Sequence, residues 1–167
     1  MRAAVITVST SVAAGFGRDE SGPLLRDLAR MLGADEVKGE VLPDDRDRLA
    51  ARLRRWADTE GCALVLTSGG TGFAPTDLTP EATRTVIERD APGIAEAMRM
   101  VSRRHTEHWM LSRAIAGIRG HTLIVNFPGS PNSIRETADY LAPALQHALD
   151  LLAGRQPHPH DHPPARG

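Results

Sequence analysis

The chain has 167 residues, which suits one domain of ordinary size, and its 41% hydrophobic and 25% charged residues allow a full buried core. The 20 basic and 21 acidic residues leave a formal net charge of -1, so the chain lacks the basic field by which proteins attract nucleic acids or anionic membranes, and we expect neither partner. No segment reaches the length of a membrane span, and we expect a cytoplasmic protein.

Short apolar runs alternate with helical periods along the chain, which is typical of a doubly wound, mostly parallel α/β sheet with helices on both faces. The first strand is expected over residues 3–9 and is followed by a glycine-bearing loop. A helix then begins near Ser21 and ends at Gly33, because serine ahead of proline favours a helix start. The second strand is expected over residues 37–42.

The second half of the chain continues the alternation. Another helix is expected after Pro43, and a third strand over residues 63–67. Two further helices follow, and Thr79 is expected to cap the first of them. The last strand is expected over residues 122–127, and in the helical segment after it Pro143 should cause a kink or a split.

The sequence predicts a single domain with a short tail. We expect the domain over residues 1–154 and a disordered tail over residues 155–167, because proline- and histidine-rich sequence cannot pack a core. The single cysteine, Cys62, cannot form an internal disulfide and is expected to behave as a small buried hydrophobe.

Two glycine-rich turns directly follow expected strands, and they are Ser68-Gly69-Gly70-Thr71-Gly72 and Pro128-Gly129-Ser130-Pro131. Glycine lets backbone N–H groups approach an anion closely, and ligands of open α/β sheets bind at the carboxyl ends of strands. One such turn alone is better explained as a tight strand-to-helix connection, but two together favour an anion site. Neither turn has a Walker or dinucleotide fingerprint, so a nucleotide would be held in another way.

Asp44 and Asp77 are candidate Mg²⁺ ligands, because each is expected just past a strand and Mg²⁺ held with nucleotide phosphates takes one or two carboxylates. The alternative for Asp44 is helix capping together with Asp47. This alternative is weaker for Asp77, since Thr79 is expected to cap the next helix. On residue physics alone, the metal role is the less favoured one at both positions.

Two further pairs of residues are weaker candidates. Ser112 and Arg113 form a candidate phosphate contact, although such a pair is usually ordinary surface. His105 and His108 lie three residues apart and have the spacing of metal ligands on one helix face. Because no third ligand is evident, a solvated or subunit-facing surface is the better interpretation of the histidines.

Six motifs in order resemble those of the Mog/MoaB family of molybdenum cofactor biosynthesis. They are Asp19-Glu20-Ser21-Gly22-Pro23-Leu24-Leu25, Leu42-Pro43-Asp44, Thr67-Ser68-Gly69-Gly70-Thr71-Gly72, Asp77-Leu78-Thr79-Pro80-Glu81-Ala82, Leu111-Ser112-Arg113 and Asn126-Phe127-Pro128-Gly129-Ser130-Pro131. The resemblance runs from about Val5 to Leu152, and its most specific part joins the Gly-Gly-Thr-Gly turn to Asp77 and the motif that follows.

The resemblance implies a compact α/β domain, commonly a homotrimer or a dimer of trimers, that transfers AMP from ATP to the terminal phosphate of molybdopterin and releases pyrophosphate. It implies catalytic, Mg²⁺-linked roles for Asp44 and Asp77. It also implies a pterin-phosphate and nucleotide pocket lined by residues 68–72 and 128–130 together with Ser112 and Arg113. One position departs from the family pattern, because Thr10 stands where relatives usually have Asp or Asn. Threonine can still cap or hydrogen-bond, so we expect function to be retained.

Three other interpretations stay open. The first is a non-catalytic MoaB-like paralogue that binds pterin or partner proteins without turnover. The second is the molybdenum-inserting branch of the superfamily, which the length of 167 residues disfavours because the related domain there lies within a much longer chain. The third is an interaction module, which predicts no nucleotide binding.

Overall fold

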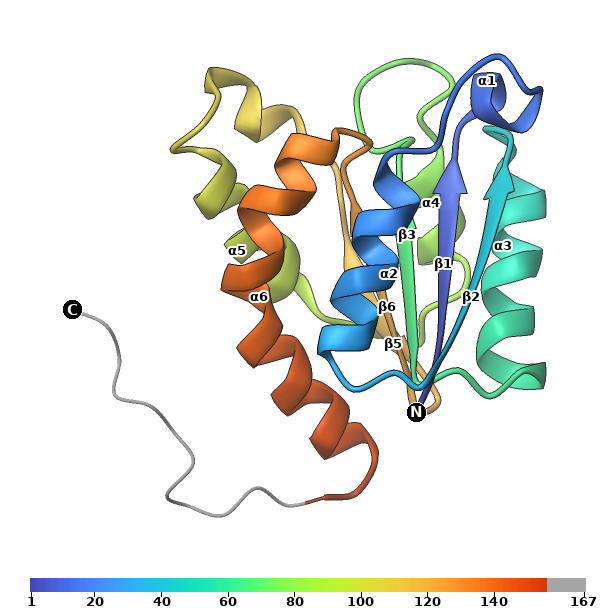
Figure 1. The fold of residues 1–167 in the computed structure, drawn as a ribbon, viewed down its shortest axis with the longest axis vertical. Coiled ribbons are helices and arrows are strands. Elements are labelled where there is room, and N and C mark those ends of the chain that lie inside the picture. Colours follow the sequence, from blue (N-terminus) through green and yellow to red (C-terminus); the bar gives the residue numbers. More distant parts are fainter. Residues whose placement is uncertain (156–167) are drawn as a thin grey trace.

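The fold is built on a six-stranded sheet in the order β2-β1-β3-β6-β5-β4, and the computed structural model describes residues 1–155 (Figure 1). The strands are β1 Arg2–Val8, β2 Glu36–Leu42, β3 Leu64–Ser68, β4 Arg89–Asp90, β5 Ala116–Arg119 and β6 Thr122–Phe127. Strands β2, β1, β3 and β6 run parallel to one another, whereas β5 and β4 pair antiparallel. The expected α/β fold with a mostly parallel sheet is confirmed, with an antiparallel edge.

Helices cover both faces of this sheet (Figure 1). One face carries α2 Ser21–Met31, α5 Pro92–Ser102 and α6 Pro131–Leu152, and the other carries α3 Arg46–Arg54 and α4 Thr79–Arg84. Three short helical segments complete the fold: α1 Thr10–Ala13, a π-helical turn at Arg55–Thr59 and a 3-10 helix at Glu107–Leu111.

The alternation of side chains along β1 divides the buried residues between two cores. Ala3 and Val5 face the core beneath α2, α5 and α6, whereas Ala4 and Ile6 face the core beneath α3 and α4. Because both faces of the central strands are covered, these strands appear in the sequence as continuous apolar runs. The two cores hold the central strands rigidly, and therefore hold the loops at their carboxyl ends in place.

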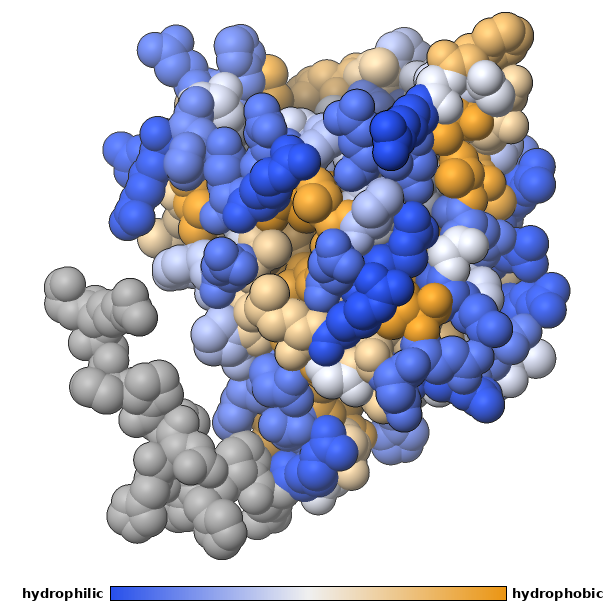
Figure 2. Space-filling model, viewed as in Figure 1, coloured by the Kyte–Doolittle hydropathy of each residue, from blue (hydrophilic) through white to orange (hydrophobic). Residues whose placement is uncertain are grey.

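The outer surface over α2 and α6 is mostly hydrophilic, with small separate hydrophobic areas (Figure 2). Within residues 1–155, no helix is long and apolar enough to cross a membrane. Of the tail expected over residues 155–167, all but Arg155 lies outside the described residues.

The expected cap of α4 is wrong, and so is the expected split of α6. Thr79 is the first residue of α4 and not its cap, because the cap position is Leu78 and the buried Thr79 hydroxyl has no hydrogen-bond partner within residues 1–155. Helix α6 runs unbroken through Pro143, so the expected split does not occur, and the kink that was the alternative stays a prediction. Leu141 and Leu145 on either side of this proline are buried in the core, and their packing outweighs the one backbone hydrogen bond that proline cannot make.

Candidate functional site

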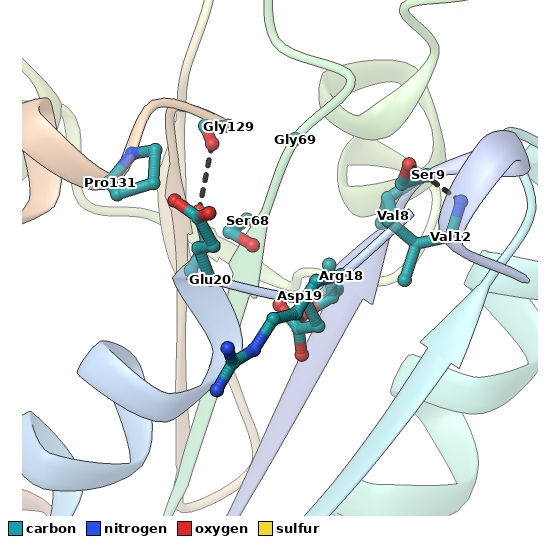
Figure 3. A pocket seen from close by; sticks show the side chains of 12 residues that line it. Val8, Ser9, Val12, Arg18, Asp19, Glu20, Ser68, Gly69, Gly129 and Pro131 are labelled. Atoms are coloured by element: carbon teal, nitrogen blue, oxygen red, sulfur yellow. Dashed lines mark hydrogen bonds between the residues drawn. The ribbon is translucent and has the colours of Figure 1, made fainter. Parts of the chain in front are cut away.

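A cavity of about 290 Å³ lies at the carboxyl ends of the parallel strands (Figure 3). β1 lies between β2 and β3, so the cavity stands where the strand order reverses, which is the place where open α/β sheets bind ligands. Its walls come from the ends of β1 and β3, the segment before α2 and the turn after β6. The lining includes Val8, Ser9, Asp19, Ser68, Gly69 and Gly129.

Positive backbone φ angles at Gly69 (93°) and Gly70 (62°) shape the turn after β3. A Cβ on Gly69 would collide with the carbonyl oxygen of Val8, and a Cβ on Gly70 would collide with the hydroxyl oxygen of Thr79. Both positions therefore require glycine. The turn starts at Ser68, which lines the cavity and is only 1% exposed, and its Oγ has no hydrogen-bond partner within the described chain. A buried hydroxyl of this kind is suited to bond a ligand.

A second cavity, of about 360 Å³, adjoins the first and shares Gly69 and Gly129 with it. Its lining adds the rest of the glycine-rich turn, together with Asp77, Ser112 and Pro128. A Cβ on Gly129 would stand 3.3 Å from the Cα of Gly69, so the two turns touch. The structure thus brings together the two glycine-rich turns that the sequence analysis singled out.

Two candidate serines beside these cavities have local partners. Ser130 caps α6, where its Oγ accepts a 3.5 Å hydrogen bond from the N–H of Ser133. The Oγ of Ser112 accepts a 3.5 Å hydrogen bond from the N–H of Ala114. Each hydroxyl acts only as an acceptor in these bonds and can still donate to a ligand.

Arg113 braces the loop between β3 and α4. Its guanidinium donates to the carbonyl oxygen of Gly72 (2.7 Å), to the carbonyl oxygen of Asp77 and to the carboxylate of Glu81. Its backbone N–H donates to the carbonyl oxygen of Thr71 (2.9 Å). The hydrogen bond from Arg113 holds the pKa of Glu81 below its usual range. The side chain of Arg113 thus joins Gly72, Asp77 and Glu81 through hydrogen bonds. The phosphate contact expected at this residue stays a prediction.

Asp77 lies at the rim of the second cavity and closes the loop that precedes α4. Its Oδ2 accepts a hydrogen bond from the N–H of Ala74 (2.8 Å), and its own N–H donates to the carbonyl oxygen of Ala74 (2.9 Å). Within residues 1–155, no hydrogen bond reaches its Oδ1. The carboxylate is therefore fixed through one oxygen, and the other is free to accept.

Asp44 does not cap α3, so the capping alternative for this residue is wrong. Asp45 is the cap, and its side chain accepts a hydrogen bond from the N–H of Arg48 (2.9 Å). The carboxylate of Asp44 instead contacts Thr10, just beyond the end of β1, through hydrogen bonds from both the N–H and the hydroxyl group of Thr10. Asp44 lies at the same edge of the sheet as the two cavities, in the loop that follows β2.

Asp19 lines the first cavity, although the sequence analysis gives it no role in a site. Its carboxylate accepts hydrogen bonds from the hydroxyl of Thr7 (3.0 Å) and from the N–H of Gly22 (2.8 Å). Next to it, the hydroxyl of Ser21 donates to the carbonyl oxygen of Gly129 (2.8 Å; Figure 3). These bonds fasten the start of α2 to β1 and to the turn after β6. The Asp-x-Ser-Gly-Pro motif is the available signal, and the sequence analysis takes it as a helix start and as one of the six family motifs, without a site role for Asp19.

Of the candidate histidines and the cysteine, His108 lines the second cavity, whereas His105 and Cys62 line neither cavity. The Nδ1 of His105 lies 3.5 Å from Oε1 of Glu136, and the backbone N–H of His108 donates to the hydroxyl oxygen of Thr106 (3.2 Å). The described part of the chain holds no group of three or more His, Cys, Asp or Glu placed to bind a metal. Cys62 is buried, and burial raises the pKa of its thiol to about 11. The thiol stays protonated at neutral pH, as expected for a small hydrophobe.

Comparisons with known proteins agree on one family. Residues 4–147 match the model described as "Probable molybdopterin binding domain". The molybdopterin adenylyltransferase of Helicobacter pylori strain J99 is 39% identical over 152 residues, which cover 90% of this chain and 86% of that protein. The molybdenum cofactor synthesis protein cinnamon of Drosophila melanogaster is 40% identical, and the match covers 89% of this chain but only 25% of cinnamon.

The fold comparison points the same way. The crystal structure of MoaB, a molybdopterin biosynthesis enzyme from Thermus thermophilus, superposes with a TM-score of 0.85 at 44% identity. The superposition covers 92% of this chain and 97% of the MoaB chain.

Proposed function

Because the chain belongs to the family of probable molybdopterin-binding domains, we propose that it is a molybdopterin adenylyltransferase of molybdenum cofactor biosynthesis, with ATP as its co-substrate. In this reaction an oxygen of the terminal phosphate of molybdopterin attacks the α-phosphorus of ATP. The bond from the α-phosphorus to the oxygen that bridges to the β-phosphorus breaks. Pyrophosphate then leaves with that electron pair, and AMP remains on the pterin phosphate.

The observation that carries the proposal is the pair of cavities that meet at Gly69 and Gly129. Group transfer between two substrates needs two adjoining sites, with the reacting atoms brought to about 3–3.5 Å. The shared rim is formed by glycine-rich turns at strand ends, and such turns suit phosphate groups because their backbone N–H groups are open to an anion. We therefore assign the reacting phosphates to this rim, with residues 68–72 and 128–130, Ser112 and Arg113 around them.

We propose that Mg²⁺ accompanies the nucleotide and that Asp44 and Asp77 are the residues that would hold it. Carboxylate oxygens are the ligands that Mg²⁺ takes in proteins, and each of these two side chains has one oxygen that accepts no hydrogen bond within residues 1–155. The donor set therefore fits the ion. When bound, Mg²⁺ would neutralise negative charge on the phosphates. The chain's own contribution is to hold the two carboxylates in fixed orientations.

Pyrophosphate release from ATP in the presence of purified molybdopterin tests the proposal. We expect release that requires both substrates, stops on chelation of divalent ions and returns with excess Mg²⁺. Binding of molybdopterin without pyrophosphate release would favour the non-catalytic paralogue. Failure to bind either substrate would favour an interaction module.

We also propose a homotrimer in the cytoplasm, which rests on the family resemblance. Light scattering on the purified protein measures the mass in solution. A trimer gives three times the 18.0 kDa of the chain, and a dimer of trimers gives six times that mass. A monomer would contradict the assembly.

A further inference from the structure

Thr10 and Asp44 follow two neighbouring strand ends. β1 and β2 pair in parallel with Val8 opposite Leu42, and the N–H of Ser9 donates to the carbonyl oxygen of Leu42 (2.8 Å), which extends the ladder by one step. Thr10 comes directly after that step on one side, and Asp44 two residues after Leu42 on the other. The backbone register therefore places the two residues together, before any contact between their side chains.

Three hydrogen bonds join this pair. The N–H and the hydroxyl of Thr10 both donate to Oδ2 of Asp44, at 2.9 and 2.7 Å. The N–H of Asp44 donates to the hydroxyl oxygen of Thr10 at 3.0 Å. The hydroxyl group of Thr10 thus donates one hydrogen bond and accepts another, and a methyl group in its place could do neither.

We propose that Thr10 is a positioning residue for Asp44, which fixes the carboxylate through Oδ2 and leaves Oδ1 to serve the reaction. This inference rests on the proposed function, because it requires Asp44 to act in catalysis. Two donors on one oxygen restrict the rotation of the carboxylate, and hydrogen bonds to a charged group are the stronger kind. The hydroxyl is the essential group, so serine replaces threonine at this position and valine does not.

A purely mechanical link between the β1 and β2 loops is the competing explanation. It predicts that loss of the hydroxyl lowers stability and leaves catalysis untouched. A positioning role predicts a fall in kcat, together with weaker binding of a divalent ion beside the nucleotide. Ion binding is measured without turnover, by titrating Mn²⁺ into the protein with a non-hydrolysable ATP analogue and following the free ion by electron paramagnetic resonance.

Three variants separate the two explanations. Thr10→Val removes the hydroxyl at nearly constant shape, and Thr10→Ser keeps it. Thr85→Val is the matched control, because Thr85 is also exposed and its hydroxyl donates one hydrogen bond, to the carbonyl oxygen of Ala82 at the end of α4 (2.8 Å). We expect Thr10→Val to lower kcat and Mn²⁺ affinity by about tenfold, the scale of one lost hydrogen bond to a charged group. Thr10→Ser should restore most of both, and the control should change neither.

A double-mutant cycle with Asp44→Asn completes the test. If Thr10 acts through the carboxylate, Thr10→Val adds little further loss in the Asp44→Asn background. An equal loss in both backgrounds, or wild-type kcat and Mn²⁺ affinity in Thr10→Val, would overturn the inference. Failure of the proposed role of Asp44 is recognised separately, from full activity of the single Asp44→Asn variant. An impaired Asp44→Asn enzyme with an unaffected Thr10→Val enzyme rejects the positioning role alone.

Discussion

Substitution with asparagine distinguishes a catalytic role of Asp44 and Asp77 from helix capping. Asparagine keeps the shape of the side chain and removes its charge. The structure gives neither carboxylate a cap to make, and the amide oxygen introduced by Asp77→Asn would still accept the hydrogen bond from Ala74. We expect Asp44→Asn and Asp77→Asn to stay folded while kcat falls on the order of 10²-fold or more, as when one electrostatic stabiliser is lost. The measurement is pyrophosphate release at saturating Mg²⁺, with circular dichroism melting as the folding control. Full activity in both variants would contradict the assignment and favour the non-catalytic paralogue.

The double variant tells whether the two carboxylates act as one unit. β2 and β3 lie on either side of β1, so their ends stand about 10 Å apart at the usual strand spacing. Two oxygens on one Mg²⁺ stand at most about 4.2 Å apart, so a shared ion requires the side chains of Asp44 and Asp77, which follow different strands, to converge. We expect the double loss in kcat to be smaller than the product of the single losses. A loss equal to the product would show two independent roles.

Arg113 provides a prediction on acid stability. Because Arg113 lowers the pKa of Glu81, the ion pair stabilises the folded state above the ordinary glutamate pKa of about 4.3. This contribution is lost as the pH falls below about 4.3 and through the lower pKa of the folded state. Arg113→Met should therefore melt at a lower temperature at pH 7 and lose less of its remaining stability between about pH 5 and pH 3. Arg135→Met is the control, since Arg135 is exposed and donates to the neutral side chain of Asn132. Parallel pH profiles for wild type and Arg113→Met would contradict the prediction.

At the level of elements, the turn after β3 predicts an order among three glycine substitutions. Gly69→Ala and Gly70→Ala each place a side chain at positive φ, which costs about 1–2 kcal/mol. Gly69→Ala is the more destabilising, because its Cβ meets the backbone of Val8, whereas the Thr79 side chain in the path of Gly70→Ala can rotate. Gly93 in α5 has ordinary φ and open space, so Gly93→Ala should be neutral or stabilising. Urea unfolding measures the three free energies of unfolding.

The same turn should also reveal its role in binding. We expect Gly70→Ala to weaken molybdopterin or ATP binding by more than it lowers the free energy of unfolding, because the added Cβ changes the lining of the second cavity. Isothermal titration gives the affinity for comparison with the unfolding data. Equal affinity in wild type and variant would remove this turn from the site.

The central elements were predictable because their signals are local. β1, β3 and β6 are continuous apolar runs, and the two glycine-rich turns stand next to β3 and β6 in the sequence. β4 has two residues and β5 four, too few for an alternating pattern to show, and they were missed. Asp19 and Arg113 act through partners distant in the sequence, so their contacts appear only in the folded chain. The motif resemblance, and not the physics of single residues, selected Asp44 and Asp77.

At the scale of the whole molecule, the strand order brings together segments that no single motif connects. It places β1 between β2 and β3, and this brings the ends of three sequence-distant strands to one edge of the sheet. The sequence supports a parallel sheet as a class, but the neighbours of each strand depend on which faces α2 and α3 cover. These helices lie on opposite faces, and the reversal between them creates the crevice that the first cavity occupies.

The C-terminal boundary of the domain provides the last prediction. α6 ends at Leu152, the N–H groups of Ala153 and Gly154 close its final turn, and Arg155 pairs with Asp150 (2.7 Å). Deletion of residues 156–167 should leave the melting temperature, the oligomeric state and pyrophosphate release unchanged, because their proline- and histidine-rich composition cannot pack a core. Truncation after Ala148 is the contrasting variant, because it removes Leu149, which is 2% exposed and packs in the larger core. That truncation should cost about 2–5 kcal/mol of unfolding free energy. A large loss of activity on deleting only residues 156–167 would place part of the working enzyme beyond Arg155.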